Sequence, residues 1–320
     1  IKGAQALRFA GDAIGGVVLL DNKPRFVSDT IYGQSVVTAQ TNGRGITASS
    51  NINRSYNSGW FYKFQGTFKY LGDLETPQYV LSNSGNREKN ISASFGHNGE
   101  NAGFDAFLSY YNATVGIAKN SHIGNIADLA NAINSGKPIV VDPFSYDIDA
   151  PKQQLNHYLA KVNFYQYLKN SAKLQLQYAF QMNDRFEYDI RRNSENKKPS
   201  LDLNLVTNSL QVDYEQDLNQ KWNIKLGSQF QLQQNSANPE TGIRPLIPNY
   251  DKVDLGLFAI TSFALNEKTS AEFGLRFDYS KIDATKFYLK SRWNERGYHQ
   301  HFEHFITGNF NNQWKTNPVF

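Results

Sequence analysis

From about Thr30 onward the chain alternates apolar and polar residues one by one. Successive side chains of a β-strand point to opposite faces, so a period of two indicates strands with one apolar and one polar face. The pattern recurs over 174–183, 222–233 and 271–280, and it is clearest over 60–70. There the apolar face would hold Trp60, Tyr62, Phe64, Phe68 and Tyr70, and the polar face Lys63, Gln65, Thr67 and Lys69.

The alternation predicts about twelve strands. They cover 31–41, 45–55, 60–70, 89–97, 102–111, 155–166, 172–183, 204–215, 221–233, 252–265, 270–280 and 302–314. After the first hairpin, short turns alternate with long loops at 71–88, 112–154, 184–203, 234–251 and 281–301. Outer-membrane barrels have short periplasmic turns and long extracellular loops. The fold class predicted is therefore all-β, a transmembrane antiparallel β-barrel.

Composition agrees with a barrel that has a wet interior. The chain has 22 Phe, 18 Tyr and 4 Trp among 320 residues, yet its mean hydropathy is only −0.56. Strands that give half their residues to lipid and half to a polar lumen combine the two properties. A soluble sandwich would carry charge on its outward face, where this chain has many glutamines. Trp60, Trp222 and Trp314 lie beside predicted short turns, as expected of an inner aromatic girdle.

The first two dozen residues have a different character. Glycines break them into short pieces, and the run Ile14–Leu20 is apolar without polar alternation. Such a run predicts a strand that is buried on both faces. Pro24 and the residues up to Asp29 would link this part to the strands that follow. The sequence thus predicts a compact piece ahead of a β-array.

The segment Lys2–Val18, with Ala13-Ile14-Gly15-Gly16-Val17 at its centre, resembles the end of the plug domain of TonB-dependent outer-membrane receptors. Ala4 stands where the family usually has proline, and Phe9-Ala10-Gly11 where it usually has Tyr-Gly. The resemblance implies that 1–24 is the C-terminal end of a plug and that 25–320 is the N-terminal part of a barrel. Plugged transporter barrels have 22 strands, so we expect a fragment with two open sheet edges.

The resemblance also implies a function. Members of this family are multi-pass barrels of the bacterial outer membrane that actively take up a scarce ligand, a small molecule or a metal complex. Their partners are TonB and its inner-membrane proton-motive complex, engaged through a segment upstream of residue 1. Ferric siderophore is the first expectation for the ligand, and zinc, haem, cobalamin or oligosaccharide stay open. A passive porin, a surface adhesin and a soluble all-β binding module are the alternatives from other classes.

Ligand contacts are expected near the outer mouth, from lumen-facing positions and long loops. The candidates are His157, Tyr188, Arg191, Arg192, His299 and His301. On a strand, His299, His301 and Glu303 would point to one side, where two imidazoles and a carboxylate suit Zn²⁺ or a bound metal complex. The alternative interpretation is that they are polar residues at the mouth of a water-filled barrel and bind no metal.

Other charged residues have a structural and a functional interpretation. Asp142, Asp147 and Asp149 offer oxygen ligands for Ca²⁺ in the outer loops, or are solvated loop charges. Basic residues of the loops 184–203 and 281–301 suit an anionic ligand or the phosphates of lipopolysaccharide, or serve solvation alone. Arg8, alone among small and apolar residues, should meet an acidic residue of the barrel wall. The favoured interpretation is that this pair fixes the plug there, and the alternative is that its breakage helps the plug to move.

Several classes of function are disfavoured. The net charge of +4 comes from scattered residues, which argues against nucleic-acid binding. The chain has no cysteine and no Gly-x-Ser-x-Gly elbow, so no catalytic set is predicted and no enzyme is expected. No resident cofactor is expected either. One helix is predicted, with Ile126, Leu129, Ala130 and Ile133 as an apolar stripe that packs on neighbouring loops.

Overall fold

The computed structural model describes residues 1–9, 15–19, 28–121, 125–190, 198–294, 297–306 and 313–319, and of Asn170 and 286–319 the backbone alone. Within these residues the strands form one large antiparallel sheet of 13 strands and a small two-stranded one. No helix in the described part of the chain is long and apolar enough to span a membrane.

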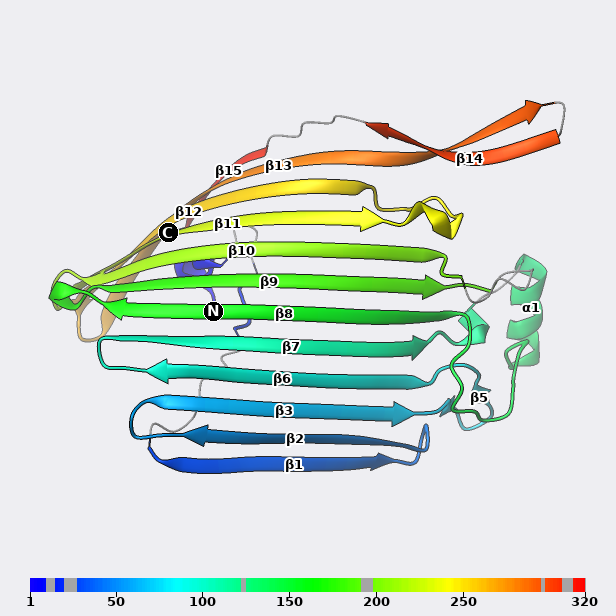
Figure 1. Cartoon of the computed structure of the whole chain (residues 1–320), viewed down its shortest axis with the longest axis horizontal. Coiled ribbons are helices and arrows are strands. Elements are labelled where there is room, and N and C mark those ends of the chain that lie inside the picture. Colours follow the sequence, from blue (N-terminus) through cyan, green and yellow to red (C-terminus); the bar gives the residue numbers. More distant parts are fainter. Residues whose placement is uncertain are drawn as a thin grey trace.

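The large sheet is a meander in which strands consecutive in the chain pair as neighbours, and its order runs from β1 to β14 (Figure 1). Its members are β1 (Thr30–Gln40), β2 (Gly45–Ser55), β3 (Trp60–Leu71), β6 (Asn86–Asn98), β7 (Ala102–Gly116), β8 (Lys152–Tyr167), β9 (Lys173–Tyr188), β10 (Leu201–Asp217), β11 (Trp222–Ala237), β12 (Asn249–Asn266), β13 (Thr269–Asn294) and β14 (Gly297–Ile306). The thirteenth strand, β15 (Gln313–Val319), pairs with β13. The predicted all-β barrel architecture is confirmed, as an open sheet.

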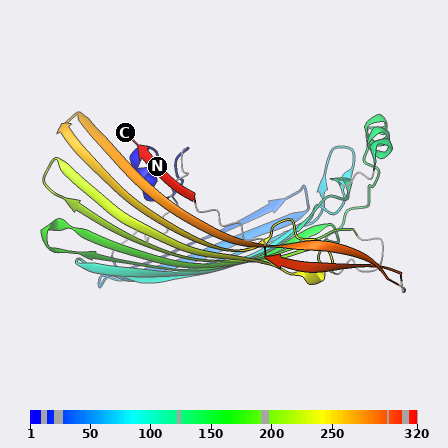
Figure 2. The same ribbon diagram turned by 90° about the horizontal axis from the view of Figure 1, so that it is seen from above.

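The sheet bends into a curved shell, and the N-terminal helix η1 (Gly3–Arg8) lies on its concave side (Figure 2). Short connections join the strands at one end of the shell, and long ones at the other (Figure 1). The predicted alternation of connection lengths is therefore present. We call these two ends the turn end and the loop end.

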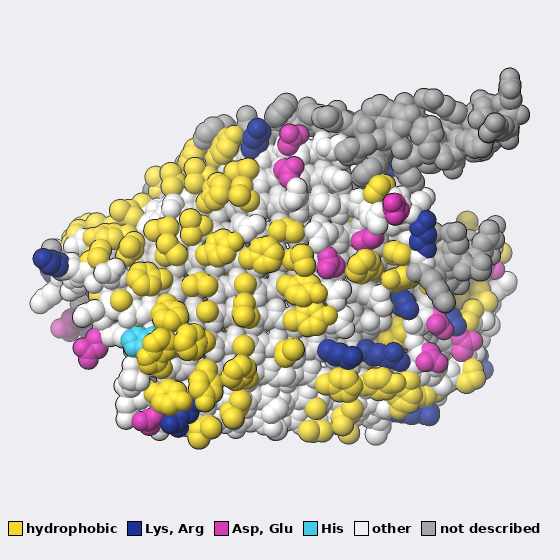
Figure 3. All heavy atoms as spheres, in the orientation of Figure 1, with side chains coloured by type: hydrophobic (Ala, Val, Ile, Leu, Met, Phe, Trp, Pro, Cys, Tyr) yellow, Lys and Arg dark blue, Asp and Glu magenta, His cyan; other side chains and the backbone are white. Residues whose placement is uncertain are grey.

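The convex face of the shell is apolar. Outward-facing side chains stay exposed along successive strands and form a band across the face (Figure 3). Its members include Phe64, Phe68, Ile91, Leu108, Val162, Leu176, Leu210, Leu226, Phe230 and Leu257. Near the turn end, Trp60 packs on Phe95 and Trp222 on Phe263, with ring centroids 5.2 and 4.4 Å apart. Aromatic rings at one margin of an apolar band are the girdle expected from the sequence.

Two predictions of strand position are wrong. The loop predicted at 281–301 is a hairpin of β13 and β14, which pair from Thr285↔Ile306 to Asn294↔Gly297. The strand predicted at 302–314 is divided between the end of β14 and the start of β15. Polar and apolar residues are mixed on both faces of 281–294, so alternation of polarity gives no signal for a strand there.

The strand predicted at Ile14–Leu20 is also wrong over the residues described, 15–19. They form no strand, and Val18 is 90% exposed. Val17 instead exchanges backbone hydrogen bonds with Ile1, at 2.8 Å and 2.7 Å. An apolar run alone does not tell a buried strand from an unpaired segment.

At the loop end, the connection 117–151 packs on the connection that contains β4 (Leu74–Glu75) and β5 (Val80–Leu81). Asp73 is only 2% exposed, and its two carboxylate oxygens accept the backbone amides of Ser84 and Ser145 at 2.9 and 3.1 Å. Asn83 donates to the carbonyls of Ile117 and Pro151 at 2.9 and 2.7 Å. These two buried polar side chains join the connections, because a buried polar group must find partners.

The predicted helix is present as α1 (Ile126–Ser135), with an Asn125 N-cap and Gly136 in the left-handed conformation at its C-terminal end. Its apolar stripe does not pack on neighbouring loops, because Ile126 is 86% and Ile133 68% exposed. The connections also contain three short 3₁₀ helices: η2 (Lys119–Ser121), η3 (Lys169–Ser171) and η4 (Pro239–Thr241).

Candidate functional site: an N-terminal segment docked on the inner wall

Residues 1–9, here called the docked segment, contact the concave face of β12 and β13. This face, with its continuation over β10 and β11, is called the inner wall. Ala4, Ala6 and Leu7 are 3–6% exposed. The small side chains let the turn of η1 approach the sheet closely.

Glycines at inward-facing strand positions make room for the segment. A Cβ on Gly274 would come within 2.8 Å of the Ala4 Cβ and 2.9 Å of Leu7. A Cβ on Gly256 would meet the guanidinium of Arg276 at 2.1 Å. Glycine within a strand often marks such a close approach. The inner wall is therefore shaped for what lies on it.

The apolar part of the contact is small. Ala4 packs with Phe258 and Ile260 of β12, which are 5% and 1% exposed. Leu7 adds an apolar contact over Gly274, and directional hydrogen bonds from polar side chains also fix the position of the segment.

Arg8 binds the wall through an ion pair. Its Nε and Nη2 donate to one carboxylate oxygen of Asp213 on β10 at 2.9 and 2.7 Å, and Nη2 also reaches Gln175 of β9 at 3.3 Å. Gln211 donates to both oxygens of Asp213, at 3.0 and 2.9 Å. The side chains of Arg8 and Asp213 are 27% and 11% exposed. The pair is thus partly shielded from water, where charges interact more strongly than at a surface.

Arg276 of β13 reaches in the opposite direction, from the wall to the segment. Its side chain is 3% exposed, and Nη1 donates to the backbone carbonyl of Leu7 at 2.7 Å. Nε donates to both oxygens of Asp278, at 2.8 and 2.9 Å, and Nη2 to Gln229 at 3.1 Å. A buried guanidinium is tolerated because it is paired and hydrogen-bonded in this way.

A third polar contact lies beside them. Gln5 donates to Glu272 of β13 and accepts from Lys225 of β11 at 3.3 Å. Glu272 also accepts from Ser262 of β12 at 3.2 Å. Each strand from β9 to β13 therefore contributes a side chain to the polar network around the docked segment.

The polar contacts of the docked segment include charge-assisted hydrogen bonds from Arg8 and Arg276. Such bonds are strong while they are sheltered and weaken once water enters.

Two predicted ligand contacts lie on opposite faces. His157 pairs with Tyr111 and Asn183, on the inward-facing register of β7, β8 and β9. Tyr188 pairs with Lys152, whose ammonium lies 5.3 Å from the centre of the tyrosine ring. Asn183, the β9 partner of His157, and Tyr188 differ by five positions, an odd number, so their side chains point to opposite faces of the sheet. The side chains of His157 and Tyr188 therefore also lie on opposite faces. They do not form one site.

The structure describes the other predicted contacts only in part. Arg191 and Arg192 lie outside the described residues. His299, His301 and Glu303 occupy alternate positions on β14, opposite Arg292, Lys290 and Tyr288 of β13. Their alternation agrees with the predicted common face, and their side chains lie outside the description. The metal site at these residues stays a prediction.

For the acidic loop residues, the Asp142 carboxylate accepts from Lys119 at 2.8 Å. Asp147 and Asp149 are bound through their backbone amides to Ser145 and Asn83. Over the ranges that the structure describes, no three histidine or carboxylate side chains converge as metal ligands. Calcium in these loops stays a prediction.

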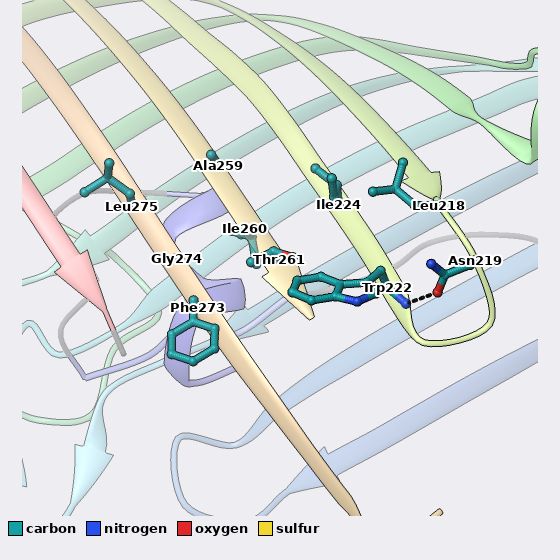
Figure 4. Close-up of a pocket in the computed structure, with 10 residues that line it drawn as sticks. All are labelled: Leu218, Asn219, Trp222, Ile224, Ala259, Ile260, Thr261, Phe273, Gly274 and Leu275. Carbon is teal, nitrogen blue, oxygen red and sulfur yellow. Dashed lines mark hydrogen bonds between the residues drawn. The ribbon is translucent and has the colours of Figure 1, made fainter. Parts of the chain in front are cut away.

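A hollow of about 830 Å³ lies at the turn end, lined mainly by outward-facing side chains of β11, β12 and β13 (Figure 4). It includes Trp222, whose backbone amide donates to Asn219 at 3.0 Å, and Phe273. Because these side chains belong to the convex face, the hollow opens away from the docked segment. It continues the apolar band and is not a lumen site.

Arg276 is the main residue that sequence reasoning missed. In the alternating pattern it is one more polar residue opposite apolar ones. The available signal was its setting, since Gly256 and Gly274 occupy inward positions in otherwise regular strands. Glycine there indicates that something lies directly on the wall.

The sequence matches no protein-family model and no curated protein. Solved structures do resemble the fold. The copper transporter OprC matches with a TM-score of 0.64 and 11% identity, over 92% of this chain and 43% of OprC. The ferric-catecholate import receptor Fiu from E. coli K12, in its open form, gives 0.61 and 9%, over 90% of this chain and 50% of Fiu. The Serratia marcescens hemophore receptor HasR, in complex with its hemophore HasA and heme, gives 0.59 and 11%, over 89% and 41%.

The chain therefore spans half or less of the structures it matches. At such identities the likeness establishes the fold. The chain has the fold of part of a TonB-dependent receptor, as the sequence predicted.

Proposed function

We propose that this chain belongs to an outer-membrane receptor that takes up a scarce ligand by active transport, and that residues 1–24 are the end of its plug. The observation that carries the proposal is the docked segment on the inner wall. A passive pore needs no element held in its lumen by matched charges. Arg8 on Asp213 and Arg276 on the Leu7 carbonyl together hold such an element.

The two faces of the sheet support a place in the membrane. The convex face is an exposed apolar band with tryptophans at one margin, whereas the concave face carries Asn, Gln, Lys, Asp and Glu. This is the division between lipid and a wet lumen. The long connections at the other end would then lie outside the cell.

For the ligand we propose a metal complex, with a ferric siderophore as the first candidate. The support is that the three structures named above are a copper transporter, a ferric-catecholate import receptor and a hemophore receptor with heme. His157 on the inward register of β8 is the described candidate for a contact in the lumen. Zinc, cobalamin and oligosaccharide remain to be separated by experiment.

The test is uptake by cells that carry or lack the complete protein. A deletion strain is grown on defined iron, zinc, copper, haem or cobalamin sources, and uptake of the radiolabelled compound is measured with and without a protonophore. We expect one source to support growth only when the protein is present, and uptake to stop when the proton-motive force is dissipated.

Three outcomes would contradict the proposal. Uptake that survives the protonophore would indicate a passive porin, which transports by diffusion. Equal growth of both strains on every metal source and on cobalamin would exclude those ligands and leave oligosaccharide uptake or adhesion. Partition of the complete protein into water without detergent would exclude the membrane assignment.

A further inference from the structure

Outward-facing residues next to the apolar band change character at the loop end. Phe68 belongs to the band, and its partner across β6 is Lys89. Lys89 lies opposite Asn112 of β7, and Asn112 opposite Asn156 of β8. Tyr70, one residue pair further out, lies opposite Arg87. The strands therefore carry apolar side chains up to this level and polar or cationic ones beyond it.

Three cations stand on this margin, and we call Arg87, Lys89 and Lys152 the basic rim. Lys89 is exposed, and within the described residues no carboxylate pairs with it. Arg87 is oriented by Tyr70, whose ring centre lies 5.0 Å from the guanidinium, and by the Tyr146 carbonyl, which accepts at 2.6 Å. The guanidinium of Arg87 is thus held in place on an aromatic ring.

Lys152 continues the rim on β8. It donates to the Ile148 carbonyl at 3.1 Å and lies over Tyr188. Together with Tyr188, Ile190 and Gln154 it lines a cavity of about 640 Å³. Lys119 and Asp149 line the same cavity, and Lys119 is paired with Asp142. A cavity lined by a phenol and an ammonium group thus lies at the loop end of β8 and β9.

The basic character stops at β8. At comparable positions β9 carries Asp184, opposite Asn156, and β12 carries Asp251, opposite Asp283 of β13. Asp184 accepts from Asn204 of β10 at 2.6 Å. Both signs of charge occur along the loop-end margin (Figure 3), and the outward-facing cations of β6 adjoin Phe68 and Ile91 of the apolar band.

We propose that the basic rim binds the phosphate of an anionic lipid in the outer leaflet. The cations lie at headgroup level if the apolar band lies in the hydrocarbon, so this inference rests on the proposed membrane location. Phe68 and Ile91 directly below them offer surface for acyl chains. A lipid matches both the cations of the basic rim and the apolar band beside them, whereas a soluble anion matches only the cations. Interfacial Lys and Arg bind anionic headgroups in this manner.

The experiment uses the complete protein in a neutral detergent, with native mass spectrometry to measure the apparent Kd for phosphatidic acid. Each rim cation should contribute about fivefold to affinity. We therefore expect K89Q to weaken binding about fivefold and R87Q/K89Q about 25-fold. Phosphatidylcholine with the same chains should bind more weakly than phosphatidic acid, and inorganic phosphate should not displace the lipid.

Lys281→Gln is the matched control, because Lys281 pairs with Val253 of the apolar face and so faces outward on β13, away from the basic rim on β6 and β8. It should change the Kd less than twofold. An unchanged Kd in K89Q would overturn the proposal, and since Lys89 is exposed, this variant should keep the fold. Displacement by millimolar inorganic phosphate would overturn the lipid assignment in favour of a free anion. Neither result touches the uptake measurements, so the two proposals fail separately.

Discussion

Arg8 and Arg276 are arginines that bind across the same contact from opposite sides. Arg8 of the docked segment forms an ion pair with Asp213 of the sheet, and Arg276 of the sheet donates a hydrogen bond to the Leu7 carbonyl of the segment. An arginine can serve both tasks because its donors form a fixed planar fork. Removal of one partner leaves the other charge sheltered and unpaired, which is the costly case.

Asp213→Asn should loosen the docked segment. With Asp213 11% exposed and Arg8 27% exposed, we expect a loss of about 1–2 kcal/mol from docking. Hydrogen exchange of residues 1–9 should then become about 5- to 30-fold faster. Asp217→Asn is the control, because Asp217 lies on the same strand and binds Asn223 at the turn end. Equal exchange in the wild type and in D213N would show that the ion pair does not hold the segment.

Gly274→Ala tests the shape of the wall without a change of charge. The added methyl would overlap Ala4 and Leu7, at 2.8 and 2.9 Å, so the segment must move away. Overpacking of this kind costs about 1–3 kcal/mol. We expect faster exchange of residues 1–9 and an unchanged β-sheet circular dichroism spectrum. Gly66→Ala should change neither, since its Cβ would meet only one atom, 4.0 Å away.

Among the elements, the two loop-end connections are joined in part by the buried carboxylate of Asp73. Asp73 accepts two backbone amides and is 2% exposed. Asp73→Ala should leave both amides unpaired and cost about 1–3 kcal/mol of local stability. Limited proteolysis should cut the connection 117–151 faster in D73A. Asp147→Ala, in the same connection but exposed, should be cut at the wild-type rate.

How well an element could be predicted depended on whether its two faces differ in polarity. β3 and β11 alternate cleanly, and both are predicted within one residue at their starts. β8 begins earlier than predicted because Lys152, Gln153 and Gln154 put polar residues on both faces. β9 continues past its predicted end, and Asp184 on its outward face interrupts the alternation there. The hairpin of β13 and β14 was missed because polar and apolar residues are mixed on both of its faces. Helix α1 was found through its cap residues and its stripe.

The candidate site was predicted in part. The isolated arginine indicated that Arg8 needs an acidic partner, but not which one, because Asp213 is 205 residues away in the chain. Arg276 looks like any lumen residue until the sheet places glycines beside it. Tyr188 was predicted to contact a ligand from the long loop 184–203, whereas it lies at the end of β9 and its side chain points to the convex face. Long-range pairing and strand phase are the two facts that local patterns lack.

For the whole molecule, the difference between the convex and concave faces predicts how it tolerates charge. Leu108 is 59% exposed on the convex face, and Ser109 next to it points inward. Leu108→Lys should destabilise the folded protein in lipid vesicles by about 2–4 kcal/mol, since a charge would face the hydrocarbon. Ser109→Lys should cost much less. Urea unfolding from vesicles measures both, and equal costs would mean that the convex face does not contact lipid.

The girdle at the turn end has an optical consequence. Trp60 and Trp222 are 41% and 39% exposed on the convex face, so both indoles lie at one depth margin of the apolar band. With Trp293 and Trp314 replaced by phenylalanine, the remaining tryptophan emission of these 320 residues would come from that margin. Lipids brominated at different acyl positions would then report how deep the turn end sits in a bilayer, and the intensity recorded over time would follow the insertion of this end as the protein folds.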